Sequence, residues 1–74
     1  MLTELKAGDK CTICNLNNIN LAVKKRLKDF GVTEGCEVCI KRVMPLGGPF
    51  MLQVKGQTVA IRKNEASKIE VERF

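Results

Sequence analysis

Apolar and polar residues alternate along most of this chain, and this pattern predicts short β-strands. In the segment 36–44, for example, Cys36, Val38 and Ile40 share one face of a strand. The tight turn Lys55-Gly56-Gln57 is expected to join two strands as a hairpin. Five segments carry the strand pattern: 10–16, 36–44, 50–54, 58–62 and 68–72.

One helix is predicted, beginning after Asn20 and ending before Gly31. Val23, Leu27 and Phe30 recur at i, i+4 and i+7, which places them on one apolar stripe. Asn20 is expected to cap the start of this helix, and Gly31 stands where a C-terminal glycine belongs.

Five short strands and one early helix predict a mainly β fold, a small SH3-like β-barrel with one short α-helix inserted after the first strand. A barrel is expected because short strands need closure to hide their edges. Asn64 is expected to cap one further helical turn over 64–67. The segment 45–49 has a proline at each end and two glycines, so it is predicted to be a loop between strands.

The length of 74 residues predicts a single domain spanning residues 1–74. Hydrophobic residues make up 45% and charged residues 28%, which is typical of a globular chain and excludes a disordered one. No apolar run approaches the ~18 residues that a membrane helix needs. The first six residues include an acid and no apolar run, so no signal peptide is expected. These features predict a cytoplasmic protein without membrane insertion.

The chain is basic, with 13 Lys and Arg against 8 Asp and Glu and a net charge of +5. This balance favours an acidic partner: nucleic acid, an anionic membrane face or an acidic protein surface. The chain lacks His, Trp and Tyr, so imidazole chemistry is absent and base stacking is limited to three Phe. No phosphate-binding loop motif is present. A non-enzymatic protein is therefore expected, and a mixed-charge solvated surface is favoured over nucleic-acid binding.

Two C-x-x-C pairs, Cys11/Cys14 and Cys36/Cys39, resemble the ligand pattern of a zinc ribbon. Four thiolates could hold Zn²⁺ or iron, and a small domain would gain stability from the metal. However, both pairs fall within predicted strands, where residues i and i+3 point to opposite faces. We therefore favour no metal or cofactor, and interpret the four thiols as small, partly buried apolar residues.

The loop Pro45-Leu46-Gly47-Gly48-Pro49 has two interpretations, a stiff connector or a docking element for a partner. Its prolines restrict the chain before binding, so an association would lose less entropy. Leu46 has no local reason to be apolar if the loop faces water; alternatively, it folds inward and plugs the barrel. Arg62 is expected to lie beside the loop and to hold an acidic group in a fork that lysine lacks.

Taken together, the landmarks of the chain run in one order from about Leu2 to Glu72. They are Leu5 to Gly8, Arg26-Leu27, Gly31, Gly35, Pro45 to Pro49, Ala60-Ile61-Arg62, Ala66, Ile69 and Val71. This set resembles the FeoA family of small ferrous-iron transport accessory proteins. The chain departs from the family's P-L-G-D-P loop, having Gly48 in place of Asp and Met44 in place of the usual Ala. The four cysteines fall where the family is variable.

The resemblance implies an SH3-like barrel that acts in the cytoplasm with FeoB, the GTP-hydrolysing ferrous-iron transporter of the bacterial inner membrane. It also implies kinship with the C-terminal SH3-like domains of iron-dependent repressors. The expected function is a non-enzymatic accessory protein that docks on FeoB and modulates it, reaching the inner membrane face through this partner. Two alternatives remain, a thiolate-coordinated zinc or iron module and a basic nucleic-acid-binding barrel.

Overall fold

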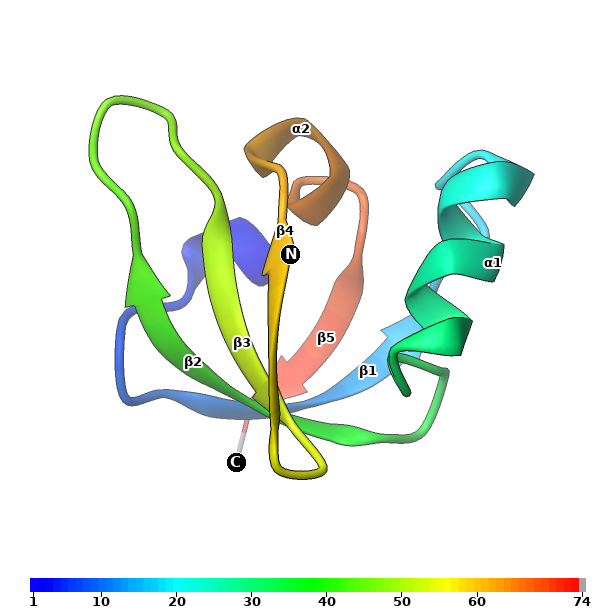
Figure 1. Cartoon of the computed structure of the whole chain (residues 1–74), viewed down its shortest axis with the longest axis horizontal. Helices are drawn as coiled ribbons and strands as arrows, with labels where there is room; N and C mark the ends of the chain where they lie inside the picture. The colour runs from blue at the N-terminus through cyan, green and yellow to red at the C-terminus, as the bar shows by residue number, and fades with distance from the viewer. Residues whose placement is uncertain (74) are drawn as a thin grey trace.

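Five antiparallel strands form one strongly curved sheet, with the helices along its open side (Figure 1). The structure, a computed structural model, describes residues 1–73. The sheet order is β4-β3-β2-β1-β5. The strands are β1 (Lys10–Asn15), β2 (Glu37–Val43), β3 (Phe50–Val54), β4 (Gln57–Ile61) and β5 (Glu70–Arg73). All five predicted strands are present, and helix α1 (Leu21–Asp29) follows the first of them as predicted.

The curved sheet has two outer strands, β4 and β5, which are not neighbours in its order. A short helix, α2 (Lys63–Ala66), joins them across the top of the sheet in Figure 1. The sheet curls into the small barrel that the sequence predicts, although β4 and β5 do not pair with each other within residues 1–73. Both outer strands are short, which limits the unpaired edge that they expose.

Helix α1 begins at the expected residue and ends at Asp29, one residue earlier than predicted. The side-chain oxygen of Asn20 accepts a hydrogen bond of 2.9 Å from the Val23 N–H. Gly31 has φ +87°, the left-handed conformation that glycine adopts readily after a helix. Leu27 is fully buried, whereas Phe30 is 45% exposed. The prediction that Phe30 belongs to the buried stripe is wrong, because this residue is the C-cap that follows the last helical residue, Asp29, where the helical spacing no longer holds.

The hairpin between β3 and β4 is a two-residue turn, since Val54 pairs with Gln57. Lys55 and Gly56 both have positive φ, 49° and 81°, as a type I′ turn requires. This turn matches the right-handed twist of the strands that it joins.

Two local features differ from the prediction. Helix α2 begins at Lys63 with Arg62 as its N-cap residue, so Asn64 lies inside the helix and is not its cap. A short 3₁₀ helix, η1 (Leu2–Glu4), precedes β1 and was not predicted. The Leu2 N–H donates to the Ile69 carbonyl at 2.9 Å, a contact between distant segments that no local pattern indicates.

The core lies inside the curl of the sheet, and nearly half of its residues come from outside the strands. Inward side chains of every second strand residue line its wall, as the alternation predicts. Residues of η1, α1, α2 and the connecting loops fill the remaining space. The buried residues are Leu2, Leu5, Cys11, Ile13, Leu16, Ile19, Leu27, Val32, Val38, Ile40, Phe50, Leu52, Val54, Val59, Ile61, Ala66 and Ile69.

No helix within residues 1–73 has the length and apolar character needed to cross a membrane.

We expect Asn20→Ala to lower the free energy of unfolding by about 1 kcal/mol, because the Val23 N–H loses its capping acceptor. Chemical denaturation measures this change. Asn18→Ala is the matched control, since this asparagine is exposed and its side chain has no hydrogen-bond partner within residues 1–73. Equal loss in both variants would contradict a specific role for the cap.

Candidate functional site

The loop 45–49 is a tight turn that projects beyond the ends of β2 and β3 (Figure 1). The Met44 N–H donates to the Pro49 carbonyl at 3.1 Å, which closes the base of the loop. Inside it, the Gly48 N–H donates to the Pro45 carbonyl, also at 3.1 Å. The loop is therefore held by its own hydrogen bonds as well as by its prolines.

Leu46 stands at the tip of this turn in an unfavourable conformation. Its φ is +59°, a left-handed value that costs a non-glycine residue about 1–2 kcal/mol. The side chain is also fully exposed, at 103%. The alternative that Leu46 folds inward and plugs the barrel is therefore wrong.

Gly48 has a steric reason to lack a side chain. A Cβ added at this position would lie 2.7 Å from the Cβ of Met44 and 3.1 Å from the Pro45 carbonyl oxygen. Real Cβ atoms do not approach other atoms so closely, so this loop path requires glycine here. Gly48, which replaces the Asp of the P-L-G-D-P loop, therefore allows this loop to pass close to Met44.

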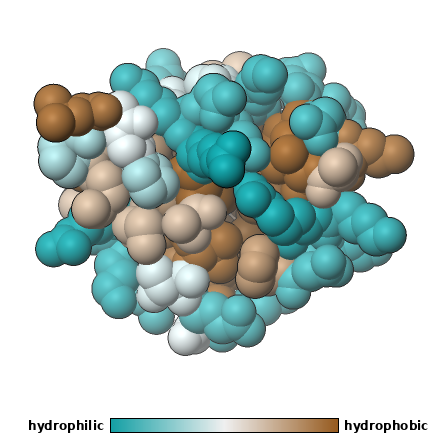
Figure 2. All heavy atoms as spheres, turned by 45° about the horizontal axis from the view of Figure 1, so that its top comes forward, coloured by the Kyte–Doolittle hydropathy of each residue, from teal (hydrophilic) through white to brown (hydrophobic). Residues whose placement is uncertain are grey.

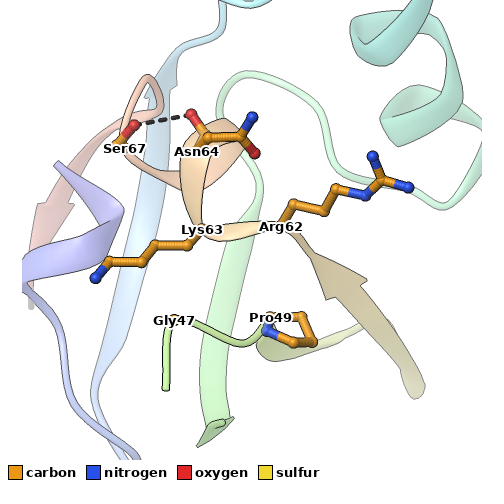
Figure 3. Close-up of a pocket in the computed structure, with 6 residues that line it drawn as sticks. All are labelled: Gly47, Pro49, Arg62, Lys63, Asn64 and Ser67. Carbon is orange, nitrogen blue, oxygen red and sulfur yellow. Dashed lines mark hydrogen bonds between the residues drawn. The ribbon is translucent and has the colours of Figure 1, made fainter. Parts of the chain in front are cut away.

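A pocket of about 560 Å³ opens between this loop and helix α2. We call it the loop pocket (Figure 3). The loop forms one wall and the start of α2 the other, and the Ser67 hydroxyl donates to the Asn64 carbonyl at 2.8 Å across the α2 turn. The lining residues are Gly47, Pro49, Arg62, Lys63, Asn64 and Ser67.

The charge of the loop pocket is positive. Figure 3 shows the side chains of Arg62 and Lys63 extending in opposite directions from the start of α2. Neither side chain forms an ion pair within residues 1–73. The pocket therefore presents two cations whose charge is available to an acidic group of another molecule.

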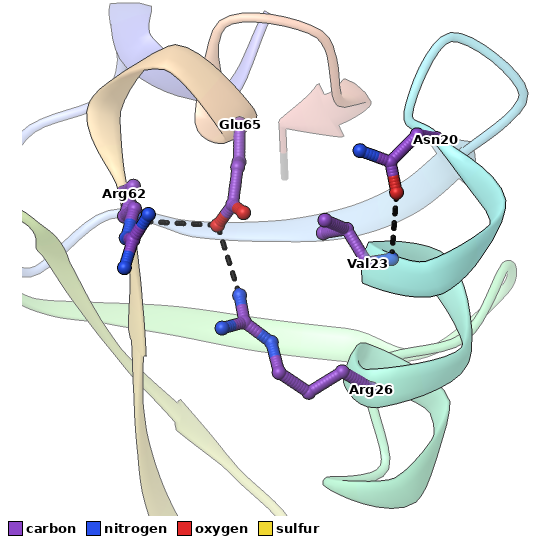
Figure 4. Close-up of polar contacts among 5 residues, drawn as sticks. All are labelled: Asn20, Val23, Arg26, Arg62 and Glu65. Atoms are coloured by element: carbon purple, nitrogen blue, oxygen red, sulfur yellow. Dashed lines mark hydrogen bonds and ion pairs between the residues drawn. The ribbon is translucent and has the colours of Figure 1, made fainter.

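Glu65, the nearest acid in the sequence, is already engaged (Figure 4). One of its oxygens accepts from the Arg26 guanidinium at 3.0 Å and from the Arg62 backbone N–H at 3.3 Å. The Glu65 side chain is only 13% exposed and Arg26 is 45% exposed, so this ion pair joins α1 to α2 at the protein surface. Because Glu65 binds Arg26, it does not neutralise the Arg62 guanidinium.

The structure brings together part of the predicted partner-binding set. One pocket is lined by Gly47, Pro49 and Arg62. The arginine therefore lies beside the loop, as predicted. Leu46 points away into solvent, and Pro45 and Gly48 are not among the residues that line the pocket. Sequence reasoning missed the contributions of Asn64 and Ser67, because it placed α2 one residue too far along the chain.

The four cysteines are free thiols that differ in burial. Cys11 is buried and Cys14 exposed, because strand alternation sends them to opposite faces of β1. Cys36 packs partly against the core, while Cys39 lies on the other face of its strand. Within residues 1–73, no three thiols or carboxylates lie close enough together to hold one metal ion.

The Cys11 thiol differs from an ordinary cysteine. Burial raises the pKa of Cys11 to about 11, and the neighbouring thiols, Cys36 first among them, add to the effect. Cys11 therefore stays protonated at neutral pH and behaves as a small apolar residue.

Comparison with known proteins identifies the class and then the family. One solved structure is FeoA from Stenotrophomonas maltophilia in complex with zinc, described as a prokaryotic SH3 domain protein. It is 27% identical to this chain, with a TM-score of 0.78, and the match covers 96% of this chain and 87% of that one. FeoA from Chlorobium tepidum is 36% identical with a TM-score of 0.91, and the match covers 99% of this chain and 69% of that one. The fold is thus an SH3-like barrel, as predicted.

The FeoA domain model matches residues 1–73, and the chain belongs to the FeoA family. A curated relative is the Fe(2+) transport protein A/Fe(2+) transporter FeoB fusion protein of Porphyromonas gingivalis, 30% identical over 71 residues. That match covers 96% of this chain but only 8% of the fusion protein. The resemblance seen in the sequence is confirmed at the level of the family.

We expect the fold to be independent of metal. Excess chelator with a reductant should leave the far-UV circular dichroism and the melting temperature nearly unchanged. A structural zinc site would contribute on the order of 10 kcal/mol, more than a small domain can lose and stay folded. Collapse of the strand signal on chelation, reversed by added zinc, would contradict this expectation.

The buried Cys11 thiol should make stability depend on alkaline pH. Because its pKa is about 11 in the folded chain against 9.0 ordinarily, the unfolded chain loses this proton first as pH rises. The contribution of the protonated Cys11 thiol to the free energy of unfolding is fully present below pH 9 and is lost between about pH 9 and pH 11.

Denaturation under reducing conditions over this pH range measures the effect, with Cys11→Ala as the comparison. The free energy of unfolding should fall more steeply with pH for the natural chain than for the variant. Parallel curves would show that Cys11 does not titrate abnormally.

Proposed function

We propose that this chain is a non-enzymatic accessory protein of bacterial ferrous iron transport. In this proposal it acts in the cytoplasm and docks on a FeoB-like membrane GTPase, which it modulates. Membership of the FeoA family and the relative in which transport protein A is fused to FeoB both support this partner. A fusion keeps its two domains at high effective concentration, which favours their association.

The exposed, strained Leu46 is the observation that carries the docking proposal. Its left-handed backbone conformation lowers the stability of the fold, and its exposed side chain contributes no hydrophobic burial to the core. Both costs are expected where a residue serves a partner, since strained backbone gathers at binding sites. Burial of this leucine in a groove of the transporter would recover about 1.5–3 kcal/mol.

The loop pocket gives the docking surface a polar half beside the apolar tip. Arg62 lies next to the loop and has no carboxylate partner within residues 1–73. Its planar guanidinium can bind a carboxylate through two parallel hydrogen bonds. We therefore assign to the partner a surface with an apolar groove and an adjacent acidic side chain.

We expect Leu46→Ala to weaken binding to a detergent-solubilised FeoB-like transporter roughly ten- to hundredfold, because the leucine contact is lost. The melting temperature should stay unchanged, since the residue is exposed. Binding can be measured by biolayer interferometry with an immobilised transporter.

Two further variants sharpen this experiment. Leu21→Ala removes another exposed leucine, 81% exposed on α1, and should leave transporter binding intact. Leu46→Asn should raise stability by up to about 1 kcal/mol while still weakening binding, because Asn tolerates positive φ better than Leu does. Equal affinity of the natural chain and both Leu46 variants would refute docking through the loop.

A further inference from the structure

The outward face of helix α1 combines one exposed leucine with a cluster of lysines. Leu21 is 81% exposed. Lys24, Lys25 and Lys28 follow it at three, four and seven residues, so they share its side of the helix. Leu27 lies outside this group on the helix and is buried in the core. We call the four outward residues the α1 face.

Three residues of the α1 face are exposed, and the fourth, Lys24, is half-buried. In Figure 1 the helix stands at the margin of the molecule, opposite the loop 45–49. In Figure 2 hydrophobic atoms project among hydrophilic ones on the side where α1 lies. The sequence of α1 does not require an apolar residue there, because Asn20 already caps the helix and the core side is complete without Leu21.

The charge of the α1 face is not neutralised by the rest of the chain. None of its three lysines forms an ion pair within residues 1–73. Lys24 donates at 3.4 Å to the side-chain oxygen of Asn17, a neutral group. Glu34 lies beside Lys24 and Lys28 on the flank of the helix, but one of its oxygens accepts from the Leu16 N–H at 3.0 Å.

We infer that the α1 face binds an anionic lipid surface, with Leu21 among the headgroups and the lysines at the phosphates. The anionic leaflet of a membrane attracts each nearby cation, and an exposed leucine among those cations can enter the headgroup region. A protein partner is a poorer match. Interfaces between proteins are depleted in lysine, whereas three of the four residues of the α1 face are lysines.

This contact is peripheral and reversible, because one leucine and three charges give only weak membrane affinity. It does not depend on the proposed transporter. Since α1 and the loop 45–49 lie on opposite sides of the molecule in Figure 1, lipid contact at α1 leaves the loop free for a protein.

The test uses the purified chain and sedimentation with vesicles, in the absence of any transporter. Vesicles of equal parts phosphatidylglycerol and phosphatidylcholine should bind the chain at low ionic strength, and pure phosphatidylcholine vesicles should not. Raising the ionic strength from about 0.01 M to about 1 M should abolish binding, since the screening length falls from about 30 Å to about 3 Å.

Two variants on the α1 face should weaken this binding. Lys24→Gln/Lys25→Gln/Lys28→Gln should reduce the partition coefficient on the order of a hundredfold, about fivefold for each charge removed. Leu21→Ala should reduce it by about tenfold. Circular dichroism checks that both variants stay folded.

The matched control is Lys6→Gln/Lys41→Gln/Lys68→Gln, which removes the same charge from exposed lysines elsewhere. This control and Leu46→Ala should retain vesicle binding. Equal weakening by the two triple variants, or equal binding to neutral vesicles, would overturn the inference. A third outcome would also overturn it: the natural chain does not bind vesicles, and the α1 variants lose binding to the detergent-solubilised transporter. In that case the α1 face would be a contact for a protein.

Discussion

The structure depends on covering the open side of a curled sheet. Five short strands can line the wall of a small core but cannot enclose it, so apolar residues from other segments must do so. Leu2 and Leu5 enter from the first segment, Leu27 from α1, and Ala66 and Ile69 from the region around α2. The positions of the helices are therefore set by the burial of their apolar residues in the core. The surfaces that the helices expose follow from those positions.

The position of the candidate site follows from the packing of α2 against the core. Helix α2 buries Ala66 in the core, and the same turn presents Asn64 and Ser67 to the loop pocket. Its start is fixed by Glu65, which also binds Arg26 on α1. The polar half of the site thus rests on elements fixed by packing, while the loop that carries Leu46 is held mainly by its own hydrogen bonds.

The sequence predicts the features that local patterns control. Alternation predicts β3 correctly, and the proximity of Arg62 to the loop is confirmed in the loop pocket. The ion pair between Arg26 and Glu65 could not be predicted, because its partners are 39 residues apart and neither has a local signature. Phe30 fits a helical stripe by spacing alone, but spacing does not show where the last turn ends.

The pairing of β1 with β5 has a consequence for the order in which the sheet can assemble. Strands β2, β3 and β4 follow one another closely and can pair as local hairpins, whereas Cys11 on β1 faces Arg73 on β5. Contacts so distant along the chain form late, because a long loop must close first. During synthesis β1 keeps one edge unpaired until the segment 70–73 has emerged. In that interval, an open strand edge exposes the nascent protein to association with other chains.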